Sequence, residues 1–354
     1  MLYHLLISLQ PTFRFLRVVD SVSFRAMAAL LTSLALSFIF GSWFIEFSKK
    51  FFRSAVREHT PETHKTKNNT PTMGGLFIIG IVLTTLFLWT DLRSPYVLIM
   101  AVTLALFAAI GFWDDWVKIC HKKGISEGQK WIAQLAAGSI VLGLWYFLVH
   151  PSTAICVPLF KELNPDLGIF YFAWALFVLV GTSNAVNLTD GLDGLAVSAL
   201  LPNFATFGCI AYCAGHLIFA HYLHMPFVGT AEVAILAVTL IGACLGFLWY
   251  NSYPAQIFMG DVGALSLGAA LGMMALVTKQ ELLLPISGLV FVGETLSVMI
   301  QVIGYKLFKI RVFRIAPIHH HYEKLGWPEM KITMRASIVT IISCLCALIM
   351  LKIR

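Results

Sequence analysis

Residues 169–195 read IFYFAWALFVLVGTSNAVNLTDGLDGL, an apolar run that ends near Val186 and passes directly into a polar turn. The run is long enough to cross a bilayer as a helix. The turn from Asn184 to Leu195 carries two carboxamides and two carboxylates, and the next apolar run starts near Leu192. Such groups are costly beside a membrane unless they face water, a cation or a ligand. The stretch therefore predicts two spanning helices with a polar junction.

Two interpretations of this junction remain open. In the first, Asp190 is the N-cap of the following helix and Asp193 occupies its third position, as in a capping box. That interpretation leaves Asn184 and Asn187 unexplained. In the second, the four polar side chains belong to a working site.

The composition decides the class of protein. The chain has 354 residues, of which 58% are hydrophobic and 12% are charged, and its mean hydropathy is +0.82. A soluble protein of this length would be roughly a quarter charged. We therefore expect an all-α integral membrane protein, because helices satisfy their own backbone groups in lipid. No linker-like stretch divides the chain, so residues 1–354 are expected to form one polytopic domain, with 1–20 as a retained interfacial segment.

Ten apolar stretches are long enough to span. An even number of spans places both termini on one side of the membrane. The expected spans are 24–47, 73–90, 95–112, 131–149, 169–186, 192–214, 230–250, 262–278, 282–304 and 336–351, and 216–225 is expected to be a loop or interfacial piece.

The positive charges favour one orientation. Loops after the odd-numbered spans carry seventeen of the twenty-five Lys and Arg residues, against seven on the other side. By the positive-inside rule these loops are cytoplasmic and both termini are periplasmic. The same rule accounts for the net charge of +7 without a nucleic-acid partner. The seven cysteines are odd in number and mostly apolar in context, so they predict no disulfide framework.

The aspartates follow the same division. Five of the eight fall on the predicted cytoplasmic loops or helix ends: Asp114, Asp115, Asp190, Asp193 and Asp261. An ion-coupled transporter, the rival from another functional class, would carry its ionisable groups near the middle of the bilayer. The distribution instead favours a site at the cytoplasmic face.

The sequence Asp114-Asp115-Trp116-Val117-Lys118 ends the third expected span. Two adjacent carboxylates at a helix C-terminus are disfavoured by the helix dipole and by each other. Lys118 offsets part of this cost, and a divalent cation or a proton-transfer role would account for the rest. Downstream, Lys122, Lys123 and Lys130 could meet phosphates or form a solvated basic face.

Two further loops carry oxygen donors and caps. Thr70 followed by Pro71 predicts a helix start whose N–H groups could hold an anion. Asp261 could cap the eighth helix, or could hold Mg²⁺ together with substrate phosphates. Phe258 could stack on a base or pack in the core.

The last cytoplasmic loop contains His319-His320-His321. In extended chain neighbouring side chains point apart, so three consecutive histidines do not readily ligate one ion. Contact with phosphate or sugar is the preferred interpretation.

These motifs, in their order and spacing, resemble the MraY family, the phospho-N-acetylmuramoyl-pentapeptide transferases of the polyprenyl-phosphate sugar-1-phosphate transferase superfamily. The resemblance covers nearly the whole chain, and 317–323 looks specific to the muramoyl-peptide branch. Small departures from the family pattern are Asn69, Ser183 and Ala264. None of them removes a charged site residue.

The resemblance implies a Mg²⁺-dependent enzyme of the bacterial cytoplasmic (inner) membrane. Undecaprenyl phosphate would attack UDP-MurNAc-pentapeptide and give lipid I and UMP. By resemblance Asp261 holds the metal, and Asp114 orients or deprotonates the lipid phosphate with Asp115 nearby. Substrate-binding residues are expected at Thr70, Lys118, Lys130, Asn187, Asp190, Asp193, Asn251, Phe258, His319, His320 and His321.

Three alternatives stay open. UDP-N-acetylglucosamine could replace the muramoyl substrate within the same superfamily. An aspartate could attack first and form a phospho-enzyme. The oligomeric state, including a homodimer, is not fixed by the sequence.

Overall fold

The computed structural model describes residues 1–52, 70–121, 123–160 and 163–353. Helices dominate these residues, and the only β-pairing among them is an isolated bridge between Ala154 and Asp166. The elements are α1 (Leu2–Leu9), the 3₁₀ helix η1 (Arg14–Asp20), α2 (Val22–Phe51), α3 (Gly74–Trp89), α4 (Pro95–His121), α5 (Glu127–Val149), α6 (Phe170–Thr189), α7 (Leu195–Ala214), α8 (Leu217–Tyr222), α9 (Ala231–Asn251), α10 (Gly260–Val277), α11 (Leu284–Ser287), α12 (Leu289–Phe308), α13 (Ile318–Lys324) and α14 (Glu329–Lys352).

The expected all-α membrane architecture is confirmed. Nine helices in the described ranges are long and apolar enough to cross a membrane, and α3 is a shorter apolar helix of 16 residues. Together they correspond to the ten expected spans. The segment 216–225, expected to be a loop or interfacial piece, contains the short helix α8.

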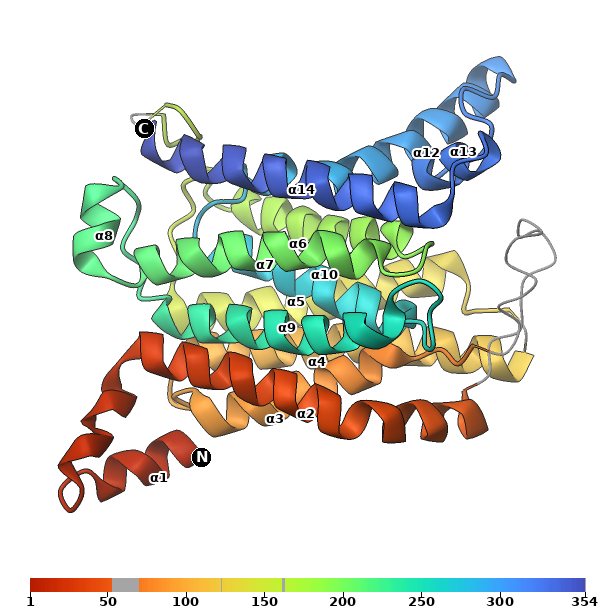
Figure 1. Ribbon diagram of the computed structural model, residues 1–354. Coiled ribbons are helices and arrows are strands. Elements are labelled where there is room, and N and C mark those ends of the chain that lie inside the picture. Colours follow the sequence, from red (N-terminus) through yellow and green to blue (C-terminus); the bar gives the residue numbers. More distant parts are fainter. Residues whose placement is uncertain (53–69, 122, 161–162, 354) are drawn as a thin grey trace.

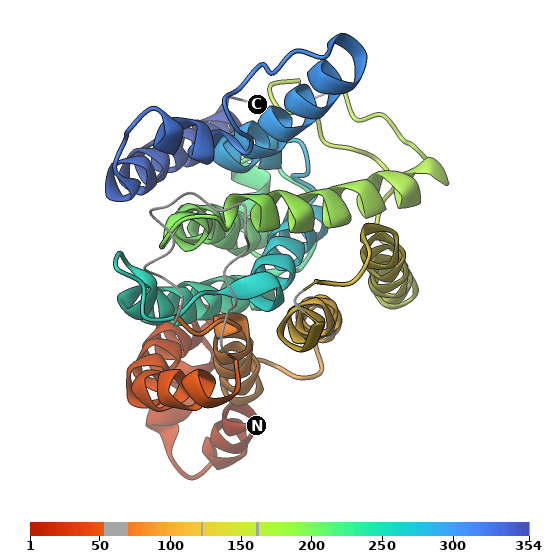
Figure 2. The ribbon, with the colours of Figure 1, turned by 90° about the vertical axis from the view of Figure 1, so that its right-hand side faces the viewer.

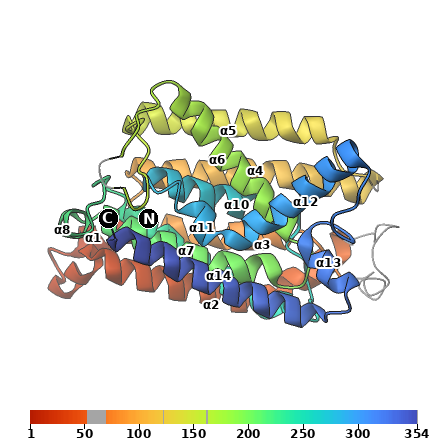
Figure 3. The same cartoon turned by 90° about the horizontal axis from the view of Figure 1, so that it is seen from above.

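The long helices form a bundle with both chain termini at one end (Figure 1). The turn between α6 and α7, the loop between α9 and α10 and the short helix α13 lie at the other end, as the view from above also shows (Figure 3). This arrangement is the one that an even number of spans requires. Most of the first basic loop, including Asn69, lies outside the described residues, as does Lys122. The compartment that each end faces remains a prediction.

Helix α10 forms the core of the bundle. Every residue from Val262 to Glu281 is buried, and α10 packs against α3, α4, α6 and α7. Glycines make this packing close. A Cβ on Gly75 of α3 would lie 2.0 Å from the backbone nitrogen of Gly263, and one on Gly111 of α4 would lie 2.3 Å from the backbone oxygen of Asp261.

The ninth expected span is divided. Residues 282–304 contain α11 and most of α12, which meet at Gly288. Helix α12 then leaves the bundle at an angle, as the side view shows (Figure 2). This tilt carries the end of α12 toward α13 and leaves most of its surface unburied by protein.

Candidate active site

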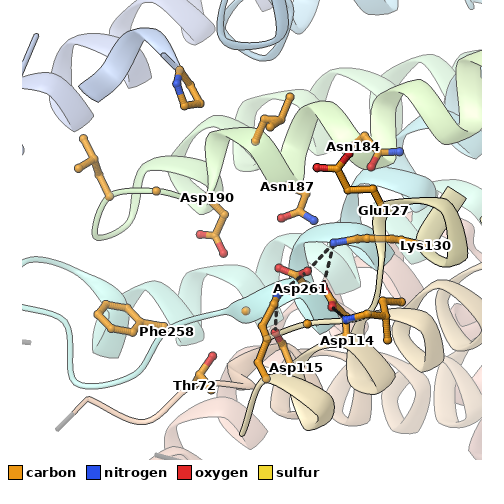
Figure 4. Close-up of a pocket in the computed structure, with 18 of the residues that line it drawn as sticks. Thr72, Asp114, Asp115, Glu127, Lys130, Asn184, Asn187, Asp190, Phe258 and Asp261 are labelled. Carbon is orange, nitrogen blue, oxygen red and sulfur yellow. Dashed lines mark hydrogen bonds and ion pairs between the residues drawn. The ribbon is translucent and has the colours of Figure 1, made fainter. Parts of the chain in front are cut away.

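A cavity of about 920 Å³ opens at the end of the bundle opposite the termini. Its walls come from α4, α5, α6, α10 and α13 and from the two loops that precede α7 and α10 (Figure 4). Two predicted site residues, Thr70 and His321, do not line it. The predicted residues that do are Asp114, Asp115, Lys118, Lys130, Asn187, Asp190, Asp193, Asn251, Phe258, Asp261, His319 and His320.

Three carboxylates converge in this cavity from two helices. Asp114 and Asp115 lie on α4, and Asp261 lies in the first turn of α10. The prediction that the aspartate pair ends its helix is wrong, because α4 continues to His121. The longer helix places Lys118 one turn after the pair, on the same face, and keeps all of these groups over the cavity.

Two lysines bind the three carboxylates together. The Nζ atom of Lys118 lies 3.0 Å from Asp114, 3.3 Å from Asp115 and 2.9 Å from Asp261. The Nζ atom of Lys130, on α5, lies 3.0 Å from Asp114 and 2.5 Å from Asp261. Charges that are partly removed from water in this way are stable only because they are paired. The expected offset of the aspartates by Lys118 is confirmed, and Lys130 completes it.

The first turn of α10 needs glycine at its start. Gly260 has a φ of +75°, and a Cβ there would lie 2.6 Å from a carboxylate oxygen of Asp115. The same oxygen accepts a hydrogen bond from the backbone N–H of Val262 at 3.3 Å. Of the two alternatives for Asp261, the one in which it caps this helix is wrong, because Met259 occupies the N-cap position.

Asn187 and Asp190 face the carboxylates from α6 and its end (Figure 4). With its amide oriented to pair donor with acceptor, Asn187 donates to Asp261 at 3.3 Å and accepts from Lys130 at 3.1 Å. Burial, followed by the charges of Asp261 and Asp115, raises the pKa of Asp190 to about 8. This carboxyl group is therefore poised to ionise when positive charge enters the cavity.

The capping interpretation of the polar turn is wrong. Gly194, in the left-handed conformation, precedes α7, and Asp190 follows the last residue of α6. Asp193 instead accepts a hydrogen bond from the backbone N–H of Ala255 at 3.0 Å. Asn251 accepts from the N–H of Gly194 at 3.1 Å and donates to the carbonyl of Ile257 at 2.8 Å. These two side chains thus hold the two loops of the cavity to each other.

The predicted helix start at Thr70 and Pro71 is also wrong. Helix α3 begins at Gly74. The N–H groups of Gly74 and Gly75 donate to the carbonyls of Phe258 and Met259, each at 2.8 Å. These N–H groups are therefore used within the protein, and they position the Phe258 loop.

The three histidines lie on the short helix α13. His319 is 1% exposed, and its Nδ1 lies 3.0 Å from the carboxylate of Glu294 on α12. His320 lies 2.5 Å from Glu323 and lines the cavity. His321 accepts a hydrogen bond from the backbone N–H of Arg314 and so stabilises the loop before α13.

Several lining residues are absent from the list of site residues that the family resemblance implied. Asn184 and Gln134 exchange hydrogen bonds of 2.6 and 3.3 Å and so join α6 to α5 one turn beyond Lys130. The sequence does indicate a role for Asn184, because it places a carboxamide at the end of an apolar run. Others that line the cavity are Thr72, Glu127 and Trp131.

The donor set suits a hard divalent cation. In the described residues no group of three or more His, Cys, Asp and Glu side chains is arranged as a metal site. Mg²⁺ does not need one, because it binds through one or two carboxylates and keeps water and substrate phosphates as its other ligands. The carboxylates that converge on Lys118 and Lys130 can supply these one or two protein ligands.

Comparison with known proteins gives consistent matches. The family described as Glycosyl transferase family 4 matches residues 97–279, which is more than half of the chain. A family named for the N-terminal transporter domain of chitin synthases matches residues 25–128, which is less than a third. The phospho-N-acetylmuramoyl-pentapeptide-transferase of Solidesulfovibrio magneticus is 46% identical over 361 aligned residues, covering 100% of both chains.

Proposed function

The chain belongs to glycosyl transferase family 4 and to the phospho-N-acetylmuramoyl-pentapeptide transferases, and from this premise we propose the reaction that it catalyses. It transfers phospho-MurNAc-pentapeptide from UDP-MurNAc-pentapeptide to undecaprenyl phosphate and releases lipid I and UMP. The protein is a multi-pass enzyme of the bacterial inner membrane. Its charged cavity opens on the cytoplasmic side, where the soluble nucleotide substrate is available.

One observation carries this proposal. Asp114, Asp115 and Asp261 meet Lys118 and Lys130 in a single cavity at the end of the bundle. Transfer of a phosphoryl group requires positioning and charge neutralisation more than covalent chemistry. A cavity with opposite charges held a few ångströms apart supplies both, because lysines can bind phosphate oxygens and carboxylates can bind a cation.

Mg²⁺ fits the donors of this cavity, and Asp261 is the residue that we propose to hold it. When bound, Mg²⁺ shields the negative charge of the reacting phosphates. Lys118 and Lys130 already contact Asp261 and would stand beside those phosphates. The pKa of Asp190 is raised to about 8. The positive charge of Mg²⁺ would lower it and so favour ionisation of a second carboxylate beside the metal.

Asp114 is proposed to orient the lipid phosphate. One of its oxygens accepts a hydrogen bond from the backbone N–H of Ile125 at 2.9 Å. The other contacts Lys118 and Lys130, each at 3.0 Å. Asp114 can therefore fix the two ammonium groups at the positions where the attacking phosphate and the diphosphate approach each other.

The remaining residues bind the nucleotide in this proposal. Phe258 would stack on the uracil ring, beside the loops that Asp193 and Asn251 hold together. Asn187 and Asp190 would line the diphosphate end, and His320 would contact a phosphate.

Direct attack by the lipid phosphate is the proposed order of events. A phosphate monoester has a second pKa near about 6, so at neutral pH it is largely dianionic and needs little activation. An aspartate nucleophile would instead approach a diphosphate against like charge. It would then have to be displaced by another anion.

The test is UMP release by the purified enzyme in detergent. Complete reactions with UDP-MurNAc-pentapeptide, undecaprenyl phosphate and Mg²⁺ should release UMP, and reactions without the lipid should release none. One equivalent of UMP in the absence of lipid, with a phospho-sugar left on the protein, would show the two-step route. UDP-N-acetylglucosamine is assayed beside the muramoyl substrate. Faster turnover of that sugar nucleotide would assign the enzyme to the other substrate class.

A further inference from the structure

Glu294 is a buried acid that the proposed mechanism leaves without a role. It lies on α12, whose other residues include no acid, and it is 4% exposed. A carboxylate in an apolar helix is costly unless it is paired, and such residues generally serve a site. The structure provides its partner on a different helix.

The partner is His319 at the edge of the cavity. Its Nδ1 lies 3.0 Å from Oε2 of Glu294, and its backbone N–H donates to the same oxygen at 3.3 Å. Two hydrogen bonds to one oxygen fix both the position and the plane of the imidazole ring. They also determine which ring nitrogen can bind a ligand. When the carboxylate accepts a hydrogen bond from Nδ1–H, Nε2 remains available to a group in the cavity.

Among the described residues, none forms a hydrogen bond with Nε2 of His319. This atom is buried, and it faces the turn where a Cβ on Gly191 would lie 2.2 Å away. Both His319 and Gly191 line the cavity. If the pair served only to hold α12 and α13 together, that role would explain the hydrogen bond to Nδ1. It would not explain a buried polar atom left unsatisfied at the site, which is costly in a folded protein.

We propose that Glu294 is a positioning residue that holds His319 as an imidazolium, with Nε2–H directed to a diphosphate oxygen of the nucleotide substrate. This inference rests on the proposed function for the identity of the ligand. The pair is neutral overall, so burying it is less costly than burying either charge alone. It adds a positive donor to a cavity where aspartates outnumber lysines. His319 thereby becomes the group that binds the substrate, and Glu294 acts through it.

The test uses two sugar nucleotides, UDP-MurNAc-pentapeptide and UDP-N-acetylglucosamine. Their diphosphate diesters do not titrate between about pH 6 and about pH 9, the range in which imidazole does. Affinity is measured by calorimetry at fixed Mg²⁺ without lipid acceptor, for the wild type, Glu294→Gln, Glu294→Asp, His319→Asn and the double variant Glu294→Gln/His319→Asn.

The wild-type affinity should fall as pH rises, because the neutral imidazole no longer donates from Nε2. In Glu294→Gln this fall should move to lower pH, since a neutral amide no longer favours the imidazolium. The loss should be roughly tenfold near pH 8, the size typical of a lost orienting partner. Glu294→Asp should recover part of it.

The double variant separates positioning from structure. His319→Asn should remove this part of the pH dependence, and adding Glu294→Gln should then change affinity less than about twofold. The other titratable or charged side chains on α13, on α12 and α14, which pack against it, and in the turn that faces His319 are the same in all of these variants. They are Asp190, Asp193, Lys306, His320, His321, Glu323, Lys324, Glu329, Lys331, Arg335 and Lys352.

Glu281 provides a matched control. It is also a buried glutamate, 1% exposed, but it contacts Tyr171 and Lys279 outside the cavity. Glu281→Gln should lower thermal stability and keep the wild-type pH dependence.

Two results would overturn the inference. The first is a wild-type pH dependence in Glu294→Gln. The second is a double variant whose loss of affinity equals the product of the losses in the two single variants. UMP release by the wild type is measured separately, so a failure of the proposed function is distinguished from a failure of the pair.

Discussion

At the scale of single residues, the charges of the site depend on one another. Lys118 contacts three carboxylates and Lys130 contacts two. Removing one member leaves its partners uncompensated in a partly buried place, which costs more than the lost contact itself. The effects of single substitutions should therefore be large and should not add.

Asp261→Asn should abolish turnover while the protein stays folded. The change removes a charged oxygen that both lysines bind and that we propose to hold Mg²⁺. We expect a loss of at least about 10³-fold, the upper range for one preorganised polar group in an active site. The measurement is UMP release, with monodispersity in detergent as the check on folding.

Asp166→Asn is the control for that experiment. Asp166 is exposed and bonds to Thr153 and Gly168 in the loop before α6, so its activity should stay near that of the wild type. If Asp261→Asn kept similar activity at ordinary Mg²⁺ concentrations, the proposed metal site would be wrong.

Asp190 should make stability depend on pH. Its pKa is raised from the ordinary value of 3.8 to about 8, so the folded protein binds this proton more tightly than the unfolded chain. The resulting stabilisation is complete below about pH 4 and is lost as pH rises toward about pH 8. Its slope is at most about 1.4 kcal/mol per pH unit.

Thermal unfolding of the wild type and Asp190→Asn, without Mg²⁺, measures this effect. The wild type should lose stability relative to the variant between about pH 5 and about pH 8. A constant difference across this range would mean that Asp190 is already ionised in the metal-free protein.

The contacts among the aspartates and Lys118 were easier to predict from the sequence than the pair formed by Glu294 and His319. The spacing of Asp114, Asp115 and Lys118 predicts contacts along one helix face, and these are confirmed. Glu294 and His319 are 25 positions apart in the sequence and lie on different helices, and their pairing depends on the tilt of α12. No local pattern records such a tilt, although an acid inside an apolar span is itself a signal.

At the scale of elements, helix centres were predictable and helix starts were not. The span 73–90 agrees closely with α3, yet its start follows neither Thr70 nor Pro71. Capping patterns describe an isolated helix whose first N–H groups need side-chain acceptors. Here the carbonyls of Phe258 and Met259 supply them from a distant loop.

Gly75→Ala should damage both stability and turnover. The added Cβ would meet the backbone of Gly263, which cannot move without shifting the first turn of α10 and Asp261 with it. We expect destabilisation of about 1–3 kcal/mol, as for other overpacked cores, and a clear loss of UMP release.

Gly80→Ala, on the same helix, has nothing within 4 Å of the new Cβ. It should leave activity unchanged and, because alanine favours helix, should not lower stability. Equal effects of the two substitutions would show that the contact of α3 with α10 does not position the site.

At the scale of the whole molecule, the number of spans and the charge pattern predict the orientation. Reporters fused within 50–68 or 305–330 should read cytoplasmic, and one after Arg354 should read periplasmic. The physical reason is the excess of Lys and Arg in the odd-numbered loops. A periplasmic reading from either loop would place the cavity on the side of the membrane without UDP-linked substrate.

The burial of α10 also governs how the protein can be made. The helices that enclose it, α3, α4, α6 and α7, all precede it in the chain, and a growing chain presents its N-terminal part first. During synthesis, α10 therefore enters a space whose walls have already been made. Asp261 is the last of the three carboxylates to arrive. A nascent chain that stops short of α10 holds Asp114 and Asp115 without Asp261, so the enzyme becomes competent only after most of its length has been threaded into the membrane.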